Sequence, residues 1–242
     1  MGNVLNRAIN PHQYDLPDTG WPYHGVGLDS PLTRVFWEYL LPYTSEWKNK
    51  DLLDVGAGTG WMLNEAYKLG VKSAIGLEPA KRNIEIAKKY FPKIKMEKTM
   101  LESFVSKKKF DYITAIMSLN HVLNIDFAFK KLSSLLKNTG KLQTIIPDYD
   151  YFNRKRHGYN IKFEKISSKE FACMVTRPDF GTLADLVRKV SIYQTAGEKY
   201  DLKLVENKSM IPTIEWMEQY PRFKKMENVT LWHLVIFKKQ KL

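Results

Sequence analysis

Residues 52–60 read LLDVGAGTG, and this stretch decides the fold of the chain. Its apolar start predicts a short buried strand, and residues 61–69 have the pattern of a helix that stops at Gly70. Glycines at alternate positions leave no Cβ over the turn between them, so a ligand can lie directly against the backbone. The free amides and the dipole of the following helix favour an anionic group there. The stretch therefore predicts a nucleotide-like cofactor at a strand–turn–helix junction.

The spacing of the glycines narrows the choice of cofactor. A dinucleotide-binding turn, Gly-x-Gly-x-x-Gly, would place its last small residue at position 61. That position holds Trp61, which is too large for the close helix–strand contact, and Gly60 comes one residue early. An NAD(P) enzyme is therefore the least favoured interpretation. The pattern of an acidic residue followed by Gly-x-Gly-x-Gly resembles motif I of the class I S-adenosylmethionine-dependent methyltransferases.

Later segments resemble further motifs of that family, in the same order. Residues 73–77 predict a second strand that ends at Glu78, where a carboxylate can accept hydrogen bonds from both hydroxyls of a ribose. Residues 110–117 and 141–147 predict two more buried strands. The resemblance covers roughly residues 50–150. It implies an α/β fold: a Rossmann-like, doubly wound sheet of seven strands in three αβα layers, mostly parallel with an antiparallel final strand.

The resemblance also implies a set of cofactor-binding residues. Asp54 matches the acid that lies near the methionine part of S-adenosylmethionine, and Glu78 matches the ribose-binding acid. One departure is Met100, which stands where the family often has an acid that contacts the adenine; Met100 and Leu101 can instead offer apolar contact and backbone hydrogen bonds. The predicted cofactor-binding residues are Asp54, Gly56, Ala57, Gly58, Gly60, Glu78, Pro79, Met100, Leu101, Met117 and Ser118.

His121 is the candidate catalytic residue. It matches a histidine common among methyltransferases of small molecules, and a neutral imidazole has a suitable pKa for taking a proton from a hydroxyl or ammonium near neutrality. The alternative is that His121 braces its loop by hydrogen bonding. Two signatures of nucleic-acid methylation are missing: Asn or Asp followed by Pro-Pro-Tyr in this motif, and a Pro-Cys context for Cys173. Both absences disfavour DNA as the substrate.

The remaining segments are expected to surround the cofactor. Residues 1–50 predict an N-terminal helical cap, and residues 51–242 the S-adenosylmethionine-binding domain. Within that domain, residues 148–181 are rich in aromatic and charged side chains, which suggests an inserted lid or substrate wall rather than sheet. Residues 182–198 predict a helix. The candidate acceptor-binding residues are Tyr23, Tyr149, Tyr151 and Arg154.

Composition limits the class of protein. A chain of 242 residues suits one α/β domain with additions, and no apolar run reaches the roughly 20 residues that a membrane helix needs. A single cysteine and the lack of a signal pattern predict a cytoplasmic protein. We further expect a monomer or a homodimer. The sequence has no paired Cys and His spacing of the kind that binds zinc, so we expect no structural metal. The net charge of +12 comes mostly from lysine, which is typical of solvated faces.

Three functions are consistent with these observations. The preferred hypothesis is methyl transfer from S-adenosylmethionine to an oxygen, nitrogen or carbon of a small or medium-sized acceptor. RNA is the alternative partner, as in a tRNA-modifying methyltransferase, supported by the basic balance and by the cluster at residues 154–157. The third is a cofactor-binding protein without catalysis, for which the departure at Met100 leaves room.

Overall fold

The computed structural model describes residues 3–20, 26–156, 159–177, 181–219 and 226–240. The first part contains α1 Asn3–Ala8, α2 Pro31–Leu40, β1 Asp51–Val55, α3 Trp61–Lys68, β2 Ser73–Leu77, α4 Lys81–Tyr90, β3 Met96–Glu97, β4 Phe110–Ile116, α5 Ile125–Leu135 and β5 Leu136–Pro147. The second part contains α6 Tyr149–Phe152, β6 Asn160–Lys165, β7 Glu170–Arg177, β8 Gly181–Arg188, α7 Val190–Glu198, β9 Leu202–Met210, α8 Ile214–Gln219 and β10 Trp232–Lys239.

The main sheet has seven strands in the order β3-β2-β1-β4-β5-β10-β9. β1 pairs in parallel with β2 and β4, whereas β10 is antiparallel to both of its neighbours. Every residue of β1 is buried, as expected for a central strand covered on both faces. The predicted mostly parallel sheet with an antiparallel final strand is confirmed.

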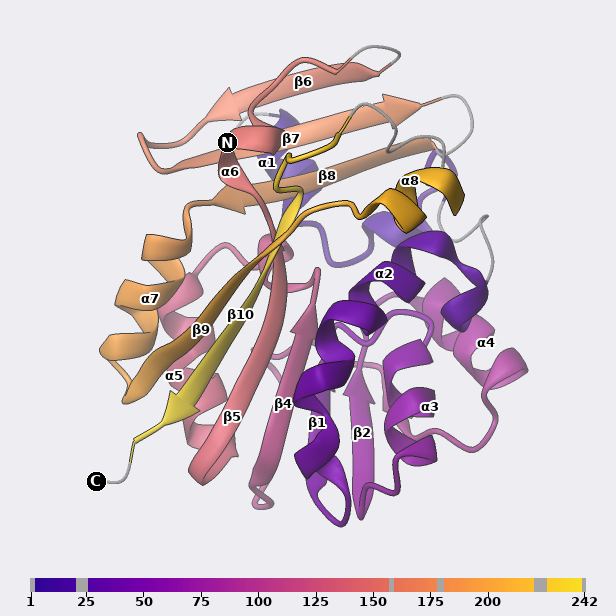
Figure 1. The fold of residues 1–242 in the computed structure, drawn as a ribbon, viewed down its shortest axis with the longest axis vertical. Coiled ribbons are helices and arrows are strands. Elements are labelled where there is room, and N and C mark those ends of the chain that lie inside the picture. Colours follow the sequence, from indigo (N-terminus) through magenta and orange to yellow (C-terminus); the bar gives the residue numbers. More distant parts are fainter. Residues whose placement is uncertain (1–2, 21–25, 157–158, 178–180, 220–225, 241–242) are drawn as a thin grey trace.

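Two apolar cores lie on opposite faces of this sheet. Leu52 packs in one core with side chains of α2 and α3, and its neighbour Leu53 packs in the other with side chains of α5 and α7. This division follows from strand geometry, because successive side chains point to opposite faces. The predicted three-layer αβα arrangement is therefore confirmed (Figure 1).

A second, three-stranded antiparallel sheet corrects two of the sequence-based expectations. Residues 148–181 were expected to form a lid or substrate wall rather than sheet, but β6, β7 and β8 form a sheet in that order. Residues 182–198 were expected to be a helix, but their first part belongs to β8 and the helix α7 begins at Val190. α1 covers one face of it through Val4, Leu5 and Ala8. In Figure 1 this small sheet lies beyond the ends to which the arrows of β2 and β4 point.

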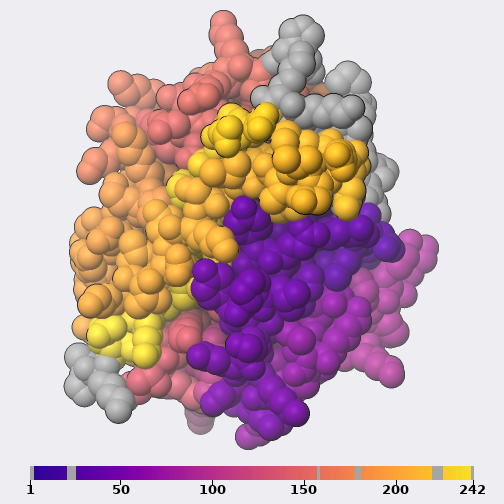
Figure 2. Space-filling view, in the orientation of Figure 1, coloured from indigo at the N-terminus to yellow at the C-terminus, as the bar shows by residue number. Residues whose placement is uncertain are grey.

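α8 packs against α2 on the outside of the molecule. The indole of Trp216 donates a hydrogen bond of 2.6 Å to Glu38, and its ring lies 5.4 Å from that of Tyr39. Figure 2 shows the gold segment with α8 meeting the indigo N-terminal segment in one continuous surface. In the part of the chain that the structure describes, no helix combines the length and the apolar character that crossing a membrane requires.

Arg188, at the end of β8, joins the small sheet to the main sheet. Its side chain is 1% exposed, and its guanidinium forms an ion pair with Glu170 of β7. It also donates hydrogen bonds to the carbonyls of Leu119, Val122 and Leu123, in the loop that follows β4. Because this loop carries the residues beside the cofactor turn, Arg188 fixes the small sheet relative to the site.

Arg188→Met should lower the free energy of unfolding by about 3–5 kcal/mol, because it leaves Glu170 and three carbonyl groups without this donor in the interior. Urea-induced unfolding measures the change. Lys162→Met on the exposed strand β6 is the matched control and should change stability by less than about 0.5 kcal/mol. A loss below about 1 kcal/mol for Arg188→Met would contradict the proposed linking role.

Candidate active site

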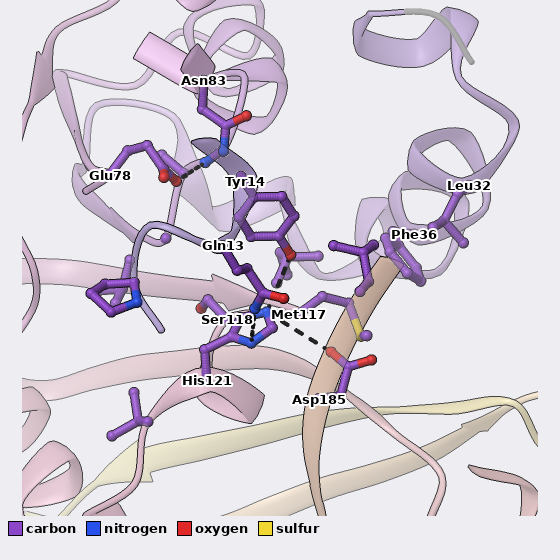
Figure 3. A pocket seen from close by; sticks show the side chains of 18 of the residues that line it. Gln13, Tyr14, Leu32, Phe36, Glu78, Asn83, Met117, Ser118, His121 and Asp185 are labelled. Atoms are coloured by element: carbon purple, nitrogen blue, oxygen red, sulfur yellow. Dashed lines mark hydrogen bonds and ion pairs between the residues drawn. The ribbon is translucent and has the colours of Figure 1, made fainter. Parts of the chain in front are cut away.

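The carboxyl ends of β1, β2 and β4 border a cavity of about 620 Å³, a volume typical of small-molecule sites. Its walls come from the N-terminal segment, α2, the glycine-rich turn, the loop after β4 and the small sheet (Figure 3). The predicted residues that line it are Asp54, Gly56, Ala57, Gly58, Glu78, Pro79, Met100, Leu101, Met117, Ser118, His121 and Tyr151.

Four other predicted residues do not belong to this lining as described. Tyr23 lies outside the described residues, and Arg154 is exposed on the surface. Tyr149 packs edge-on against Phe171 and donates to the carbonyl of Ser168. Gly60 is not among the lining residues, although its neighbours Thr59 and Trp61 are. Its φ of +78° favours glycine, and a Cβ there would also come within 2.1 Å of the side-chain end of Ile94, which follows α4.

The two earlier glycines of the turn have different reasons for being glycine. Gly58 has a φ of +53°, and a Cβ there would meet no protein atom within 4 Å, so its bare backbone faces the open cavity. Gly56 has a φ of +68°, and a Cβ there would lie 2.4 Å from the Cβ of Ser118. Gly56 therefore allows the turn and the loop after β4 to approach closely, while Gly58 leaves room for a ligand.

Glu78, at the end of β2, holds this turn in place. Its buried carboxylate accepts hydrogen bonds from the amide of Gly58 at 2.8 Å and the amide of Ala80 at 2.9 Å. The side chain of Asn83 donates a third (Figure 3). Burial raises the pKa of Glu78, and the two amide bonds counteract this rise. Asn83 lines the cavity but was missed in the sequence, because it reads as an ordinary helix residue.

Asp54 lies deeper, at the end of β1. Its carboxylate accepts a hydrogen bond of 2.7 Å from the hydroxyl of Thr114 on β4. Burial nevertheless raises its pKa to about 7, and the nearby charge of Glu78 adds to the rise. An ionised Asp54 therefore lacks a full complement of partners within the protein, and a cation at this end of the cavity would stabilise it.

His121 follows β4 and lies within a cluster of polar groups from distant segments (Figure 3). Its Nδ1 is 3.0 Å from the carbonyl oxygen of Ala8 and 3.0 Å from the side-chain amide nitrogen of Gln13. Its Nε2 is 3.2 Å from the hydroxyl of Tyr14 and 3.3 Å from the side-chain amide nitrogen of Asn120. The carbonyl of Ala8 can only accept, so a proton on Nδ1 would bind it and would leave Nε2 as an acceptor that faces the hydroxyl of Tyr14 and the side-chain amide of Asn120.

Asp185 of β8 completes this cluster. Its Oδ1 lies 3.9 Å from Nε2 of His121 and accepts a hydrogen bond of 2.6 Å from Asn120. Burial raises the pKa of Asp185, and the charge of a protonated His121 opposes that rise. Sequence reasoning missed both Tyr14 and Asp185, because they reach His121 from an N-terminal segment and from a strand that was expected to be helix.

The residues present fit S-adenosylmethionine. The bare turn at Gly58 leaves space for it, and Glu78 offers a carboxylate beside that space. Among the described residues, the hydroxyl of Ser118 and the side-chain oxygen of Asn83 are buried without a hydrogen-bond partner, and both residues line the cavity. These polar groups, together with the partly compensated Asp54, match a ligand with hydroxyl, amino and aromatic parts.

A doubly wound sheet of this strand order, with an acid–glycine turn and an acid after its second strand, defines the fold of class I S-adenosylmethionine-dependent methyltransferases. A family model described as "Methyltransferase domain" matches residues 32–189, and the chain belongs to this family. The expected cofactor, S-adenosylmethionine, is confirmed with it.

Several known proteins are similar to the chain. A ubiquinone biosynthesis O-methyltransferase of Pelagibacter ubique is 39% identical over 97 residues, which cover 38% of this chain and 40% of that relative. A tRNA U34 carboxymethyltransferase of Shewanella sediminis is 33% identical over 58 residues, covering 24% of this chain and 18% of the relative. The sequence matches thus span well under half the length of these curated relatives.

Solved structures share the fold over most of the chain. The N-methyltransferase NodS of Bradyrhizobium japonicum, in complex with S-adenosyl-l-homocysteine, superposes with a TM-score of 0.66 at 15% identity, covering 96% of this chain and all of NodS. The PH0226 protein of Pyrococcus horikoshii gives a TM-score of 0.70 at 15% identity and covers 94% of this chain and 98% of that one. At these identities the likeness concerns the fold.

Gly58→Ala and Gly60→Ala should separate cofactor binding from packing. A methyl group at Gly58 enters open cavity, so affinity for S-adenosylhomocysteine should fall at least tenfold, with a stability loss of about 1–2 kcal/mol from the positive φ. At Gly60 the methyl group meets Ile94, so overpacking adds about 1–3 kcal/mol to that loss. Calorimetric titration and urea unfolding measure both quantities. Unchanged affinity in Gly58→Ala would refute the placement of the cofactor.

Asp54→Asn should raise the melting temperature of the ligand-free protein at pH 8.5 and have a smaller effect at pH 5.5. The folded-state pKa of about 7 lies above the ordinary value of 3.8. The stability gained from protonating Asp54 is therefore complete below pH 3.8 and is lost as the pH rises to about 7. Asparagine keeps an oxygen for Thr114 without the charge. Equal melting shifts at both pH values would show that Asp54 does not titrate in this range.

Proposed function

We propose that this protein transfers the methyl group of S-adenosylmethionine to an oxygen of a small-molecule acceptor. The observation that carries the proposal is one continuous cavity that contains both the glycine turn and His121. The O-methyltransferase of Pelagibacter ubique supports oxygen as the acceptor atom, because it is 39% identical over the matched region. Transfer to nitrogen or carbon is the alternative within the same fold.

The proposed roles at the cofactor follow from the positions of the acids. Glu78 would accept the ribose hydroxyls, and Asp54 would face the amino group of the methionine part, which supplies the cation that its buried carboxylate lacks. Gly58 would leave its backbone against the cofactor, and Met100 with Leu101 would flank the adenine. The bound cofactor supplies an electrophilic methyl group that a correctly placed nucleophile can attack.

His121 would serve the acceptor. With the proton on Nδ1, Nε2 would take a hydroxyl proton either directly, in place of its contact with Asn120, or through the hydroxyl of Tyr14, 3.2 Å away. Asp185, 3.9 Å from Nε2, would stabilise the imidazolium that results. The N-terminal segment and α2 line the cavity and would exclude water from the reacting groups. The small sheet would act as the acceptor wall.

Neither alternative function gains support. The tRNA-modifying relative matches over only 18% of its length, and Arg154, within the basic cluster that suggested RNA, is exposed away from the cavity. A protein that binds the cofactor without catalysis would not need the base and acid that meet at His121. We further infer a cytoplasmic location, supported by the single cysteine, and a monomeric or homodimeric state.

His121→Gln should lower kcat by about 10²–10³-fold, because glutamine can hold hydrogen bonds but cannot take the proton. Transfer of a radiolabelled methyl group from S-adenosylmethionine to a panel of phenols and catechols measures the rate, and calorimetry should show unchanged affinity for S-adenosylhomocysteine. His233→Gln is the matched control, because His233 of β10 pairs with Asp148, which precedes α6, and does not line the cavity.

A different result would favour the bracing alternative for His121. If His121→Gln kept its rate on every acceptor while its melting temperature fell, the imidazole would position the loop after β4 and the base hypothesis would be wrong. If no phenol or catechol were methylated by the unmodified protein, oxygen would be the wrong acceptor atom.

A further inference from the structure

Two arginines line the acceptor side of the cavity, and the sequence motifs assign neither of them a role. Arg156 lies in the loop between α6 and β6, and Arg177 ends β7. Both guanidiniums stack on aromatic rings. That of Arg156 lies 5.2 Å from the ring centre of Tyr151 and 5.0 Å from that of Phe152, and that of Arg177 lies 4.9 Å from Tyr159. These contacts fix the planes of two cationic forks within the cavity wall.

The guanidinium of Arg156 has hydrogen-bond donors that its contacts within the protein do not satisfy. Its Nε is buried and has no hydrogen-bond partner among the described residues. One terminal nitrogen contacts the sulfur of Cys173 at 3.8 Å, which is a weak acceptor. A cation with an unpaired buried donor gains from an oxyanion that enters the cavity, because charged hydrogen bonds are strongest where water is excluded.

The shape of the guanidinium of Arg156 indicates which oxyanion fits. Asp185 is the lining acid whose charge interacts with Arg156, and its Oδ1 is already bound by Asn120. The planar fork geometry matches a planar carboxylate that accepts two parallel hydrogen bonds.

We propose that the methyl acceptor carries a carboxylate, bound by Arg156 and Arg177, with its reacting hydroxyl directed to His121. This assignment rests on the proposed function, since it names the substrate class of the same cavity. Arg156 and Arg177 would then determine specificity: they select acidic over neutral acceptors and orient the acceptor between the small sheet and the cofactor turn.

The test compares benzoate with benzamide, which has nearly the same shape but no charge. Calorimetric titration of the 242-residue protein, saturated with S-adenosylhomocysteine, should give at least tenfold tighter binding of benzoate. Arg156→Gln and Arg177→Gln should each weaken benzoate binding at least tenfold and change benzamide binding less than twofold. Arg154→Gln, two residues from Arg156 but exposed, is the matched control and should change neither affinity more than twofold.

Three results would overturn the proposal. Equal affinity for benzoate and benzamide, or an unchanged benzoate affinity in both cavity variants, would refute an anion subsite. Tighter binding of phenyl phosphate than of benzoate would refute a carboxylate as the ligand group. An unchanged affinity of each variant for S-adenosylhomocysteine would show that its fold is intact. Failure of the unmodified protein to bind S-adenosylhomocysteine would instead refute the proposed function, which keeps the two failures distinct.

Discussion

The hydrogen bonds of the Glu78 carboxylate are the interaction on which the site depends. Glu78 is 4% exposed, and a carboxylate removed from water to this extent needs donors from the protein. Two of the donors are the backbone amides of Gly58 in the glycine turn and of Ala80 before α4, at 2.8 and 2.9 Å, and the third is the side chain of Asn83. One side chain thus joins the end of β2, the turn after β1 and the start of α4. Through its hydrogen bond to Gly58, this carboxylate stabilises the turn conformation in which Gly56 and Gly58 have positive φ.

The part of the cavity that we propose binds the acceptor depends on contacts between distant parts of the chain. Gln13 pairs with the backbone of Ala184 on β8 through both its amide nitrogen and its oxygen, and it also lies 3.0 Å from His121. Arg188, at the end of the same strand, binds carbonyls of the loop after β4. Hydrogen bonds therefore join the N-terminal segment, the small sheet and the loop that carries His121. A change in any of them would alter the surroundings of the imidazole.

The main sheet could be predicted from the sequence, whereas the small sheet could not. β1 and β2 are short apolar runs between turn residues, and a buried parallel strand needs only that local pattern. β8 contains Leu183, Leu186 and Val187, a spacing that also suits one face of a helix. Its strand form is decided by eight residue pairs with β7 and by the cover of α1, neither of which is visible locally. β6 is an exposed edge strand rich in lysine, so its polar pattern resembled a loop.

The same difference separates the two halves of the site. The cofactor half relies on backbone geometry, which restricts a position such as Gly58 to one residue type and therefore leaves a signature in the sequence. The acceptor half relies on side chains whose direction depends on how loops and strands pair in three dimensions. Arg154 and Arg156 belong to one basic cluster, yet Arg154 is exposed and Arg156 stacks on Phe152 in the cavity wall. A cluster of charges carries no information about which of its members points inward. If Arg156 binds the acceptor as proposed, a change in the packing of this one loop would alter acceptor binding while the glycine turn stayed the same.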